Sequence, residues 1–571
     1  MLVPDRERLI TVIVYSVPVL FLVLFLLYPL LSVLEPGFTG ADGRPTMENL
    51  GKVLGSSRSM GIVRFTIMQA IISTLATLVA ALPGAFIIAR YRFPGKSSLL
   101  ALTTVPFVLP PLVLGIGFIS LFGTSGLIQG ILNAITGITG TGDVQVNLLY
   151  SKEAIIVAHI FLNFPIALRI LHSRLTTMDP DIINASRSLG AGPVRTFFKV
   201  MLPQMRYSIL SAASLIFTFC LLTFGVVMVI GGMSNSTLEM EIFRQFNGLF
   251  DESTAAVLLS IEVALVSLST FVYIWSSRRS GVSSHMARGP GMNMIPSYGR
   301  GGRRALMVLL YAVLIGVVVL GPMLAVVHDS LTVEREGDEE YSLEWYGRML
   351  SREGDPTIGA SPMGAVMNSL LFAFLTVVTA VPMSVLTAYA LDRPRSRGKW
   401  ALDTFLLFPL GVSTVALGIG MLSGFNGGFL DLGGSWIPIL IVHTMIAYPL
   451  GARAVLAAKR EIPDHLIDAS RSLGSGRFRA FMDVELPLLL PGIVIAAVFA
   501  FAISIGEFGA TLMVAPPEYT TMPIALYKFI SGGRDFGSAT AYAVLIMLVT
   551  FSSMFIMDHF GRRFTRRSGS V

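Results

Sequence analysis

The chain has 571 residues, of which 53% are hydrophobic and only 13% are charged. Soluble proteins carry about 25% charged residues, so this composition excludes an ordinary soluble domain and indicates a membrane protein. The net charge of +7 reflects basic loops between apolar segments and not nucleic-acid binding. The single cysteine, Cys220, excludes an internal disulfide and argues against a cysteine-based metal site.

Apolar segments follow one another along the whole chain, and each is about as long as the 20 residues that a helix needs to cross a bilayer. Segments 5 and 11 are longer and rich in glycine, so we expect each to tilt or bend. The first is too long for a cleaved signal peptide. We expect twelve spans, at roughly 10–34, 63–89, 97–122, 148–172, 204–232, 253–276, 304–327, 363–391, 400–424, 435–457, 488–514 and 537–558.

The sequence also repeats itself once. The hexapeptide Ala185–Gly190 recurs unchanged as Ala469–Gly474, and a Leu-Pro pair follows each copy at the same distance, ending at Pro203 and Pro487. A repeat at half the chain length indicates two fused copies of one unit. We therefore predict an all-α polytopic membrane protein with two homologous six-helix halves, 1–276 and 304–571, joined by a Ser/Gly/Arg-rich linker at 277–303.

Most of the 42 Lys and Arg residues fall in alternate loops. Because basic loops stay on the inner side of a membrane, this bias predicts a cell-membrane protein with both termini and both repeated stretches in the cytoplasm. The loop 328–361 is acidic and is expected outside, either as a solvated loop or as a docking patch for an external partner.

The repeated stretch is too polar to span a membrane. Good helix formers run from Asp181 to Leu189, Gly190 permits a sharp turn, and a second short helix leads to Pro203. One interpretation is a basic helix lying on the bilayer surface. Near-identity of the two copies favours the other interpretation, a pair of equivalent docking elements.

These residues resemble the EAA-type motif of the fused permease subunits of binding-protein-dependent ABC importers. Asn184 and Asp468 replace the first glutamate, and serine occupies the third position of each copy. The resemblance implies a type I permease fold, two copies of a cytoplasmic ABC ATPase that hold ATP and Mg, one external substrate-binding protein, and no cofactor in this chain. It implies coupling helices that dock on the ATPases through Asn184, Ala185, Ser186, Gly190, Asp468, Ala469, Ser470 and Gly474.

We expect neither an ATP site nor a catalytic site in this chain. Gly95-Lys96-Ser97 resembles the end of a phosphate-binding loop, but Arg90 stands where its first glycine belongs. Alternatives to the ABC permease are an ion-coupled secondary carrier with two parallel halves, a membrane scaffold or receptor, and a membrane enzyme. The scarcity of acidic residues within the spans argues against the carrier.

Charged residues inside spans are costly and often functional. Glu507, whose counterpart in the first half is Thr223, either lines the translocation path or is a structural carboxylate. Glu262 raises the same question, and His159 and His443 occupy equivalent positions. We favour interhelical hydrogen bonding over metal ligation for these histidines.

The runs 223–239 and 504–523 resemble permeases of the thiamine and ferric iron branch. This resemblance implies thiamine or ferric iron as the cargo, and it favours neither of them. In such importers the external binding protein sets the selectivity.

Overall fold

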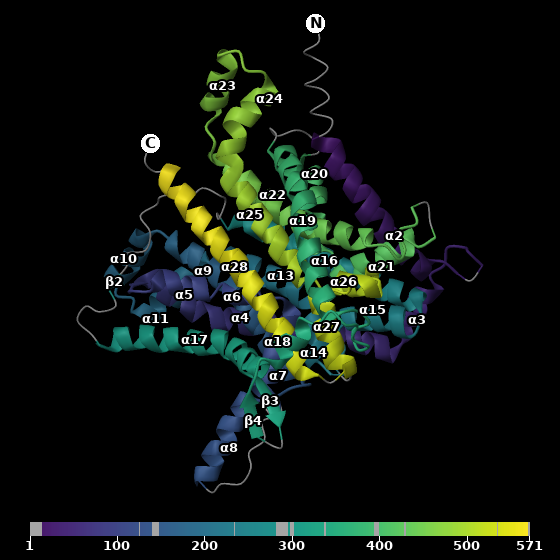
Figure 1. The fold of residues 1–571 in the computed structure, drawn as a ribbon. Helices are drawn as coiled ribbons and strands as arrows, with labels where there is room; N and C mark the ends of the chain where they lie inside the picture. The colour runs from purple at the N-terminus through teal and green to yellow at the C-terminus, as the bar shows by residue number, and fades with distance from the viewer. Residues whose placement is uncertain are drawn as a thin grey trace. The chain divides into compact units, whose positions relative to one another are not determined.

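The structure is a computed structural model that describes residues 14–568, apart from 41, 125, 140–147, 233–234, 281–294, 297–301, 336–337, 393–398, 428–429 and 534. Most of the predicted linker therefore lies outside the described residues. Where the chain is described it is almost entirely helical, and its strands form two short pairs (Figure 1). Tyr91–Arg92 (β1) pairs in parallel with Ile295–Pro296 (β2), and Thr332–Arg335 (β3) pairs antiparallel with Asp338–Tyr341 (β4).

The apolar segments form long helices, as the composition predicts. The described residues contain ten helices that are long and apolar enough to cross a membrane. An eleventh span is a helix pair, Pro193–Gln204 and Arg206–Leu221, that bends by 67°. The remaining expected segment, the ninth at 400–424, supplies only the shorter helix Thr414–Phe425 (α21), because the chain before it breaks at Pro409 into a separate helix and a 3-10 turn.

Prolines and glycines divide the other irregular spans as well. Segment 3 breaks around Pro106 and Pro110, so that a separate helix begins at Pro111. Segments 5 and 11 break at equivalent places, since α13 ends at Leu221 and α25 ends at Gly506, each shortly before a short second helix. The predicted bend in the two glycine-rich segments is thus a complete interruption of the helix.

One compact unit spans Gly37–Asp329. Its centre is α4, which packs against α9 and α13, and α13 also packs against α16. Small and apolar side chains such as Ala70, Ala167 and Ala212 fill the space between these helices. The helices are α3 (Glu48–Gly55), α4 (Ser57–Arg90), α5 (Lys96–Leu102), α6 (Val105–Val108), α7 (Pro111–Phe122), α8 (Leu127–Thr139), α9 (Lys152–Thr176), α10 (Pro180–Ser188), α11 (Pro193–Thr196), η3 (Phe197–Met201), α12 (Leu202–Gln204), α13 (Arg206–Leu221), α14 (Gly225–Ile230), α15 (Leu238–Phe243), η4 (Arg244–Gly248), α16 (Glu252–Arg279) and α17 (Gly302–Leu331).

The other compact unit combines residues 1–36 with 330–571. Here α19 packs against α22 and α25, as α4 packs against α9 and α13. The elements are η1 (Val23–Leu27), α2 (Tyr28–Leu34), η2 (Glu35–Phe38, which crosses the boundary), α18 (Glu344–Met349), α19 (Pro362–Leu391), α20 (Lys399–Leu406), η5 (Phe408–Gly411), α21, α22 (Ile437–Glu461), α23 (Asp464–Ser472), α24 (Arg477–Ala480), η6 (Phe481–Glu485), α25 (Leu486–Gly506), α26 (Gly509–Val514), η7 (Pro517–Tyr519), α27 (Met522–Lys528), η8 (Phe529–Gly533) and α28 (Phe536–Ser568).

Each compact unit contains the long helix that begins the opposite half of the sequence. In the first unit described above, Pro322 of α17 lies against Gly117 of α7, where a Cβ would come within 3.1 Å of the proline carbonyl oxygen. In the other unit Pro29 of α2 lies against Gly420 of α21, and a Cβ there would lie 3.0 Å from the Pro29 oxygen. The two glycines occupy equivalent positions of the repeat, so glycine permits the same close helix approach twice. The predicted boundaries at 276 and 304 describe the sequence repeat and stay a prediction, because the compact units divide the chain elsewhere.

Candidate functional site

The first copy of the repeated stretch forms a short helix, a turn and a second helix. Asp179 accepts a hydrogen bond from the Asp181 backbone N–H (2.9 Å) and so caps α10. The helix ends where the Gly190 N–H donates to the Arg187 carbonyl oxygen (2.9 Å). Gly190 has a φ of +80°, a left-handed conformation that favours glycine. The sharp turn predicted from the sequence therefore forms at this glycine.

The second copy folds in the same way between α23 and α24. The Gly474 N–H donates to the Arg471 carbonyl oxygen (2.9 Å), and Gly474 has a φ of +88°. Figure 1 shows α23 and α24 at the far end of the arm that α22 and α25 form. Identical residues therefore build identical turns in two places that the sequence predicts to be equivalent.

The predicted coupling residues lie on the surface of these two elements. Asn184, Ala185 and Gly190 are exposed, as are Asp468, Ala469 and Gly474, whereas Ser186 and Ser470 are half-buried. The exposed side chains are therefore available to a partner, whereas the Ser186 hydroxyl lies 3.2 Å from that of Thr196.

Each element also exposes apolar side chains, which the sequence analysis did not single out. Leu189 is 88% exposed and Leu473 is 89% exposed, and both stand directly before the turn glycine. Three further pairs of equivalent positions are exposed and apolar: Ile182 and Leu466, Val194 and Phe478, and Phe198 and Met482. Exposed apolar side chains that gather on a polar loop are typical of a site that contacts a protein partner or a membrane. The sequence could have indicated this surface, because both copies have an apolar residue at each of these positions.

An aromatic contact joins each element to the first core helix of its half. Phe86 of α4 meets Phe197 with ring centroids 6.0 Å apart, and Tyr389 of α19 meets Phe481 at 5.9 Å. In the second half the Tyr389 hydroxyl also donates to the Glu485 carboxylate. These contacts connect the two repeated elements to α4 and α19.

Glu507 is buried and lies at the break between α25 and α26. Its carboxylate accepts hydrogen bonds from the backbone N–H groups of Ala510 and Thr511, both at 2.9 Å, and from the Thr511 hydroxyl. His443 Nε2 lies 3.5 Å from the same carboxylate. Glu507 thus stabilises the N-terminus of α26, where a negative charge is favoured. This arrangement matches the structural interpretation, and a role for Glu507 and Thr223 in a substrate path stays a prediction.

The two equivalent histidines hydrogen-bond to neighbouring helices. His443 Nδ1 lies 2.7 Å from Ser504 Oγ and its Nε2 lies 2.8 Å from Thr511 Oγ1. His159 Nδ1 lies 3.2 Å from Ser73 Oγ. In the part of the chain that the structure describes, no group of three or more potential metal-binding side chains gathers. The geometry around the histidines is that of interhelical hydrogen bonding.

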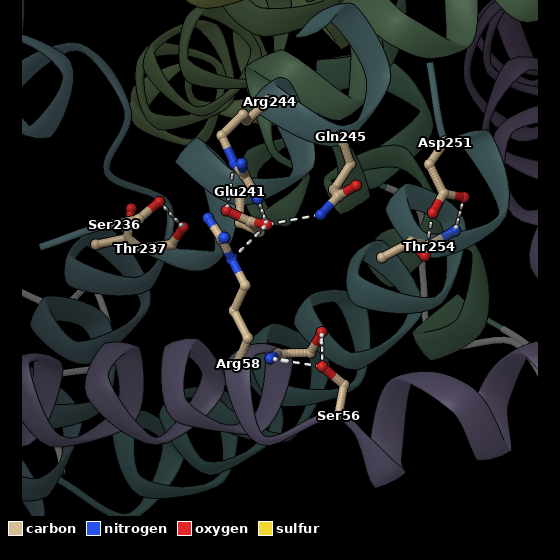
Figure 2. A network of polar contacts seen from close by, with 10 residues as sticks. Ser56, Arg58, Ser236, Thr237, Glu241, Arg244, Gln245, Asp251 and Thr254 are labelled. Carbon is tan, nitrogen blue, oxygen red and sulfur yellow. Dashed lines mark hydrogen bonds and ion pairs between the residues drawn. The ribbon is translucent and has the colours of Figure 1, made fainter. Parts of the chain in front are cut away.

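Buried acids gather in the first half, where the sequence analysis named only Glu262. Figure 2 shows Glu241 of α15 surrounded by donors. Arg244 Nε donates to its carboxylate at 2.9 Å, Gln245 Nε2 donates at 2.7 Å, and Arg58 of α4 lies 3.8 Å away. The spacing of Glu241, Arg244 and Gln245 along one helix could have indicated this network. The network joins the start of α4 to α15.

Glu262 of α16 is also buried, and so is Glu239 of α15. The positions equivalent to Glu239 and Glu241 in the second half are Pro523 and Ala525. The two halves therefore differ in the charge of their buried polar groups. The sequence indicates the same difference, since Thr223 occupies the position equivalent to Glu507.

Lys96 follows a two-residue strand and a turn at Gly95, whose φ is +78°. Burial, and then the nearby Arg92, lower the pKa of the Lys96 ammonium group. The Lys96 ammonium lies 3.5 Å from the Tyr91 carbonyl oxygen. The local geometry is that of a helix start next to a basic turn.

Two stretches of the chain match one protein family. The family described as "Binding-protein-dependent transport system inner membrane component" matches twice, at residues 81–280 and 357–566. These two stretches hold the two repeated elements and the buried acids Glu241, Glu262 and Glu507.

Among curated proteins, the chain is similar to the ferric transport system permease protein FbpB of Actinobacillus pleuropneumoniae. The two are 25% identical over 550 residues, which cover 95% of this chain and 77% of the relative. It is 28% identical over 510 residues to the thiamine transport system permease protein ThiP of Salmonella typhimurium, covering 85% of this chain and 86% of the relative. Among solved structures, a chain of a bacterial ABC transporter for import of the polysaccharide alginate matches with a TM-score of 0.40 and 14% identity, covering 48% of this chain and 96% of that one.

Proposed function

Because the chain belongs to the family of binding-protein-dependent transport system inner membrane components, we propose that its two fused halves form the translocation path for thiamine or ferric iron in an ABC importer. The chain is the membrane subunit of such a system. The names of the relatives support these two cargoes in equal measure, since one is a ferric and one a thiamine permease.

The pair of exposed elements around Leu189 and Leu473 is the observation that carries the proposal. Each presents an apolar side chain at its tip, and an exposed apolar tip is stabilised when a partner covers it. Two equivalent tips favour two copies of one partner. We propose two copies of a cytoplasmic ABC ATPase, which bind ATP and Mg, and one external binding protein that delivers the cargo.

The same proposal sets the orientation of the chain. The basic residues near both elements favour the cytoplasmic side, so the acidic hairpin β3–β4 faces outward. ATP-driven movement of the ATPases would shift α10 and α23, and the aromatic contacts at Phe86 and Tyr389 would pass that shift to α4 and α19. In this proposal the chain supplies the translocation path and the two repeated elements that move, and the ATPase supplies the energy.

Reconstitution tests the function directly. The chain is co-purified with a candidate ABC ATPase, placed in liposomes and supplied with a candidate binding protein. We expect uptake of thiamine or of ferric iron that needs both ATP and the binding protein. Uptake that continues without ATP and stops when an ion gradient is removed would identify a secondary carrier instead. Failure of the ATPase to co-purify would contradict the proposed docking.

A charge-neutral variant tests the predicted role of Glu507. Glu507→Gln keeps the shape but weakens the charge-assisted hydrogen bonds to Ala510 and Thr511, each worth about 1.5–3 kcal/mol. We expect uptake to fall by at least about tenfold while the ATPase still co-purifies. Glu518→Gln, at an exposed position nearby, is the matched control. Unchanged uptake in Glu507→Gln would assign the carboxylate a structural role alone.

A further inference from the structure

Aromatic and basic side chains gather where α13 begins and α16 ends. The rings of Tyr207 and Trp275 meet edge to face, with centroids 5.9 Å apart. The Arg206 guanidinium lies 4.7 Å from the centroid of the Tyr207 ring, and that of Arg279 lies 4.5 Å from the Trp275 centroid and 5.9 Å from the Tyr207 centroid. We call these four residues the α13–α16 cluster. It holds two cations against one aromatic pair.

The positive charge of the cluster is not neutralised by the chain. Among the described residues neither Arg206 nor Arg279 forms an ion pair, whereas Arg58, Arg244, Arg335 and Arg348 all do. The sequence explains this difference, because no Asp or Glu occurs in 182–238 or in 263–328. The cluster therefore offers two exposed guanidinium groups to an anion from outside the chain.

An apolar stripe runs from the cluster along α16. Leu268 and Phe271 are each 62% exposed and lead to Trp275 on the same helix face. Leu210 of α13 is also partly exposed beside this stripe, and the hydroxyl of Thr218 donates to Ser269 (2.9 Å), which holds the two helices together. A stripe of this kind in a membrane helix faces acyl chains, and the arginines stand at its polar end.

We propose that the α13–α16 cluster binds the headgroup of an anionic phospholipid, with one acyl chain lying along the stripe formed by Leu268, Phe271 and Trp275. Guanidinium groups match the geometry of a phosphate diester, and aromatic rings of Tyr and Trp favour the membrane boundary. Basic pockets between membrane helices bind such headgroups on the inner side. The proposal concerns the lipid bilayer itself and does not depend on the cargo.

The second half lacks the same cluster. Leu490 and Pro491 occupy the positions equivalent to Arg206 and Tyr207. The proposal therefore predicts one strong site per chain and not two, which distinguishes it from general attraction of a basic protein to an anionic surface.

Native mass spectrometry of the purified full-length chain tests the site. The chain is incubated with phosphatidylglycerol or with phosphatidylcholine of the same acyl chains, and retained lipids are counted after detergent removal. We expect wild type to retain one phosphatidylglycerol in preference to phosphatidylcholine. The double variant Arg206→Gln with Arg279→Gln should bind phosphatidylglycerol about 25-fold more weakly, the product of about fivefold for each charge.

Three further measurements test which groups bind the lipid. Tyr207→Leu with Trp275→Leu keeps both charges and should weaken binding by about fivefold, and Arg335→Gln, whose guanidinium pairs with Glu344 (3.0 Å), should change nothing. Excess inorganic phosphate should not displace the lipid, and displacement would show a free-phosphate site instead. Equal retention of the two lipids by wild type, or undiminished phosphatidylglycerol in a double variant that elutes as a folded species, would overturn the proposal. Loss of ATPase binding without loss of lipid would overturn it too, because the cluster would then be a protein interface.

Discussion

The two repeated elements share a backbone but differ in the polar contacts that hold them. In the first copy the contacts are internal, because Asp179 caps α10 and the hydroxyls of Ser186 and Thr196 lie 3.2 Å apart. In the second copy proline and alanine occupy the positions of Asp179 and Thr196.

The contacts of the second copy lead outward to α19. Lys459 donates to Asp392 at 2.5 Å, Arg460 lies 3.6 Å from the same carboxylate, and Tyr389 donates to Glu485. In the first half, Ala89 and Leu175 stand where Asp392 and Lys459 stand in the second. The comparison teaches that the turn and the apolar tip are the shared requirement, whereas the means of holding them can differ.

The largest effect should come from the shared apolar tips. Leu189→Asp combined with Leu473→Asp removes two side chains whose burial in a partner would each contribute about 1.5–3 kcal/mol. We expect the ATPase to bind at least about 100-fold more weakly, measured by co-purification and by titration in nanodiscs. Either single variant should have a smaller effect, and two equal single effects would show equivalent docking. Arg187→Gln on the same surface is a control that keeps the tips, and full ATPase binding by the double variant would contradict the docking proposal.

The next largest effect should come from substitutions of the turn glycines Gly190 and Gly474. Gly190→Val forces a β-branched residue into a left-handed conformation, at a cost of about 1–2 kcal/mol, although no atom lies within 4 Å of the added Cβ. We expect uptake in liposomes to fall several-fold, and Gly474→Val should do the same. Gly192→Val is the matched control, since Gly192 has a φ of −65° that valine adopts readily. Equal effects at Gly190 and Gly192 would show that the turn conformation is unimportant.

The third largest effect is expected at the helix cap, which the first copy has and the second copy lacks. Asp179→Ala removes the side-chain acceptor at the start of α10 and should destabilise that helix by about 1 kcal/mol. Hydrogen exchange of the α10 amides should then speed up about fivefold, while α23 exchanges as before. Pro463→Asp would add a cap to the second copy and should slow exchange in α23. No change in α10 would mean that the cap contributes nothing.

The smallest effect is expected at the outward contacts of the second copy. Asp392→Asn removes the partner of Lys459 and Arg460, and partly exposed ion pairs contribute only about 0.2–1 kcal/mol each. Exchange should increase slightly at the end of α22 and in η6, and high salt should reduce the difference between variant and wild type. An increase in α10 of similar size would show that the two copies are not held independently.

Local features of this fold follow from the sequence, and distant contacts do not. The helix predicted at Asp181–Leu189 forms at Pro180–Ser188, and prolines interrupt the helices of segments 3 and 9. These features depend on neighbours along the chain, where capping and proline act. The ninth segment was predicted as a full span and is shorter, because the 3-10 turn Phe408–Gly411, which contains Pro409, uses part of its length.

The same distinction between local and distant contacts decides which candidate sites could be predicted from the sequence. The repeated elements were found from the sequence, because identity between copies survives without any knowledge of packing. The surroundings of Glu241 were not, since Arg58 approaches it from a distant helix. The capping role of Glu507 was open, because a carboxylate beside glycines fits a path or a helix start until the N–H groups that it accepts are known.

The close approach of Pro322 to Gly117 and of Pro29 to Gly420 has a consequence for how such a chain can arise and be divided. Cutting the chain at the linker would leave two polypeptides, each lacking a helix that its own folded body needs. Neither would be expected to accumulate alone, whereas the pair expressed together could still assemble. Joining the copies in one chain guarantees that every missing helix is synthesised in equal number beside the body that receives it.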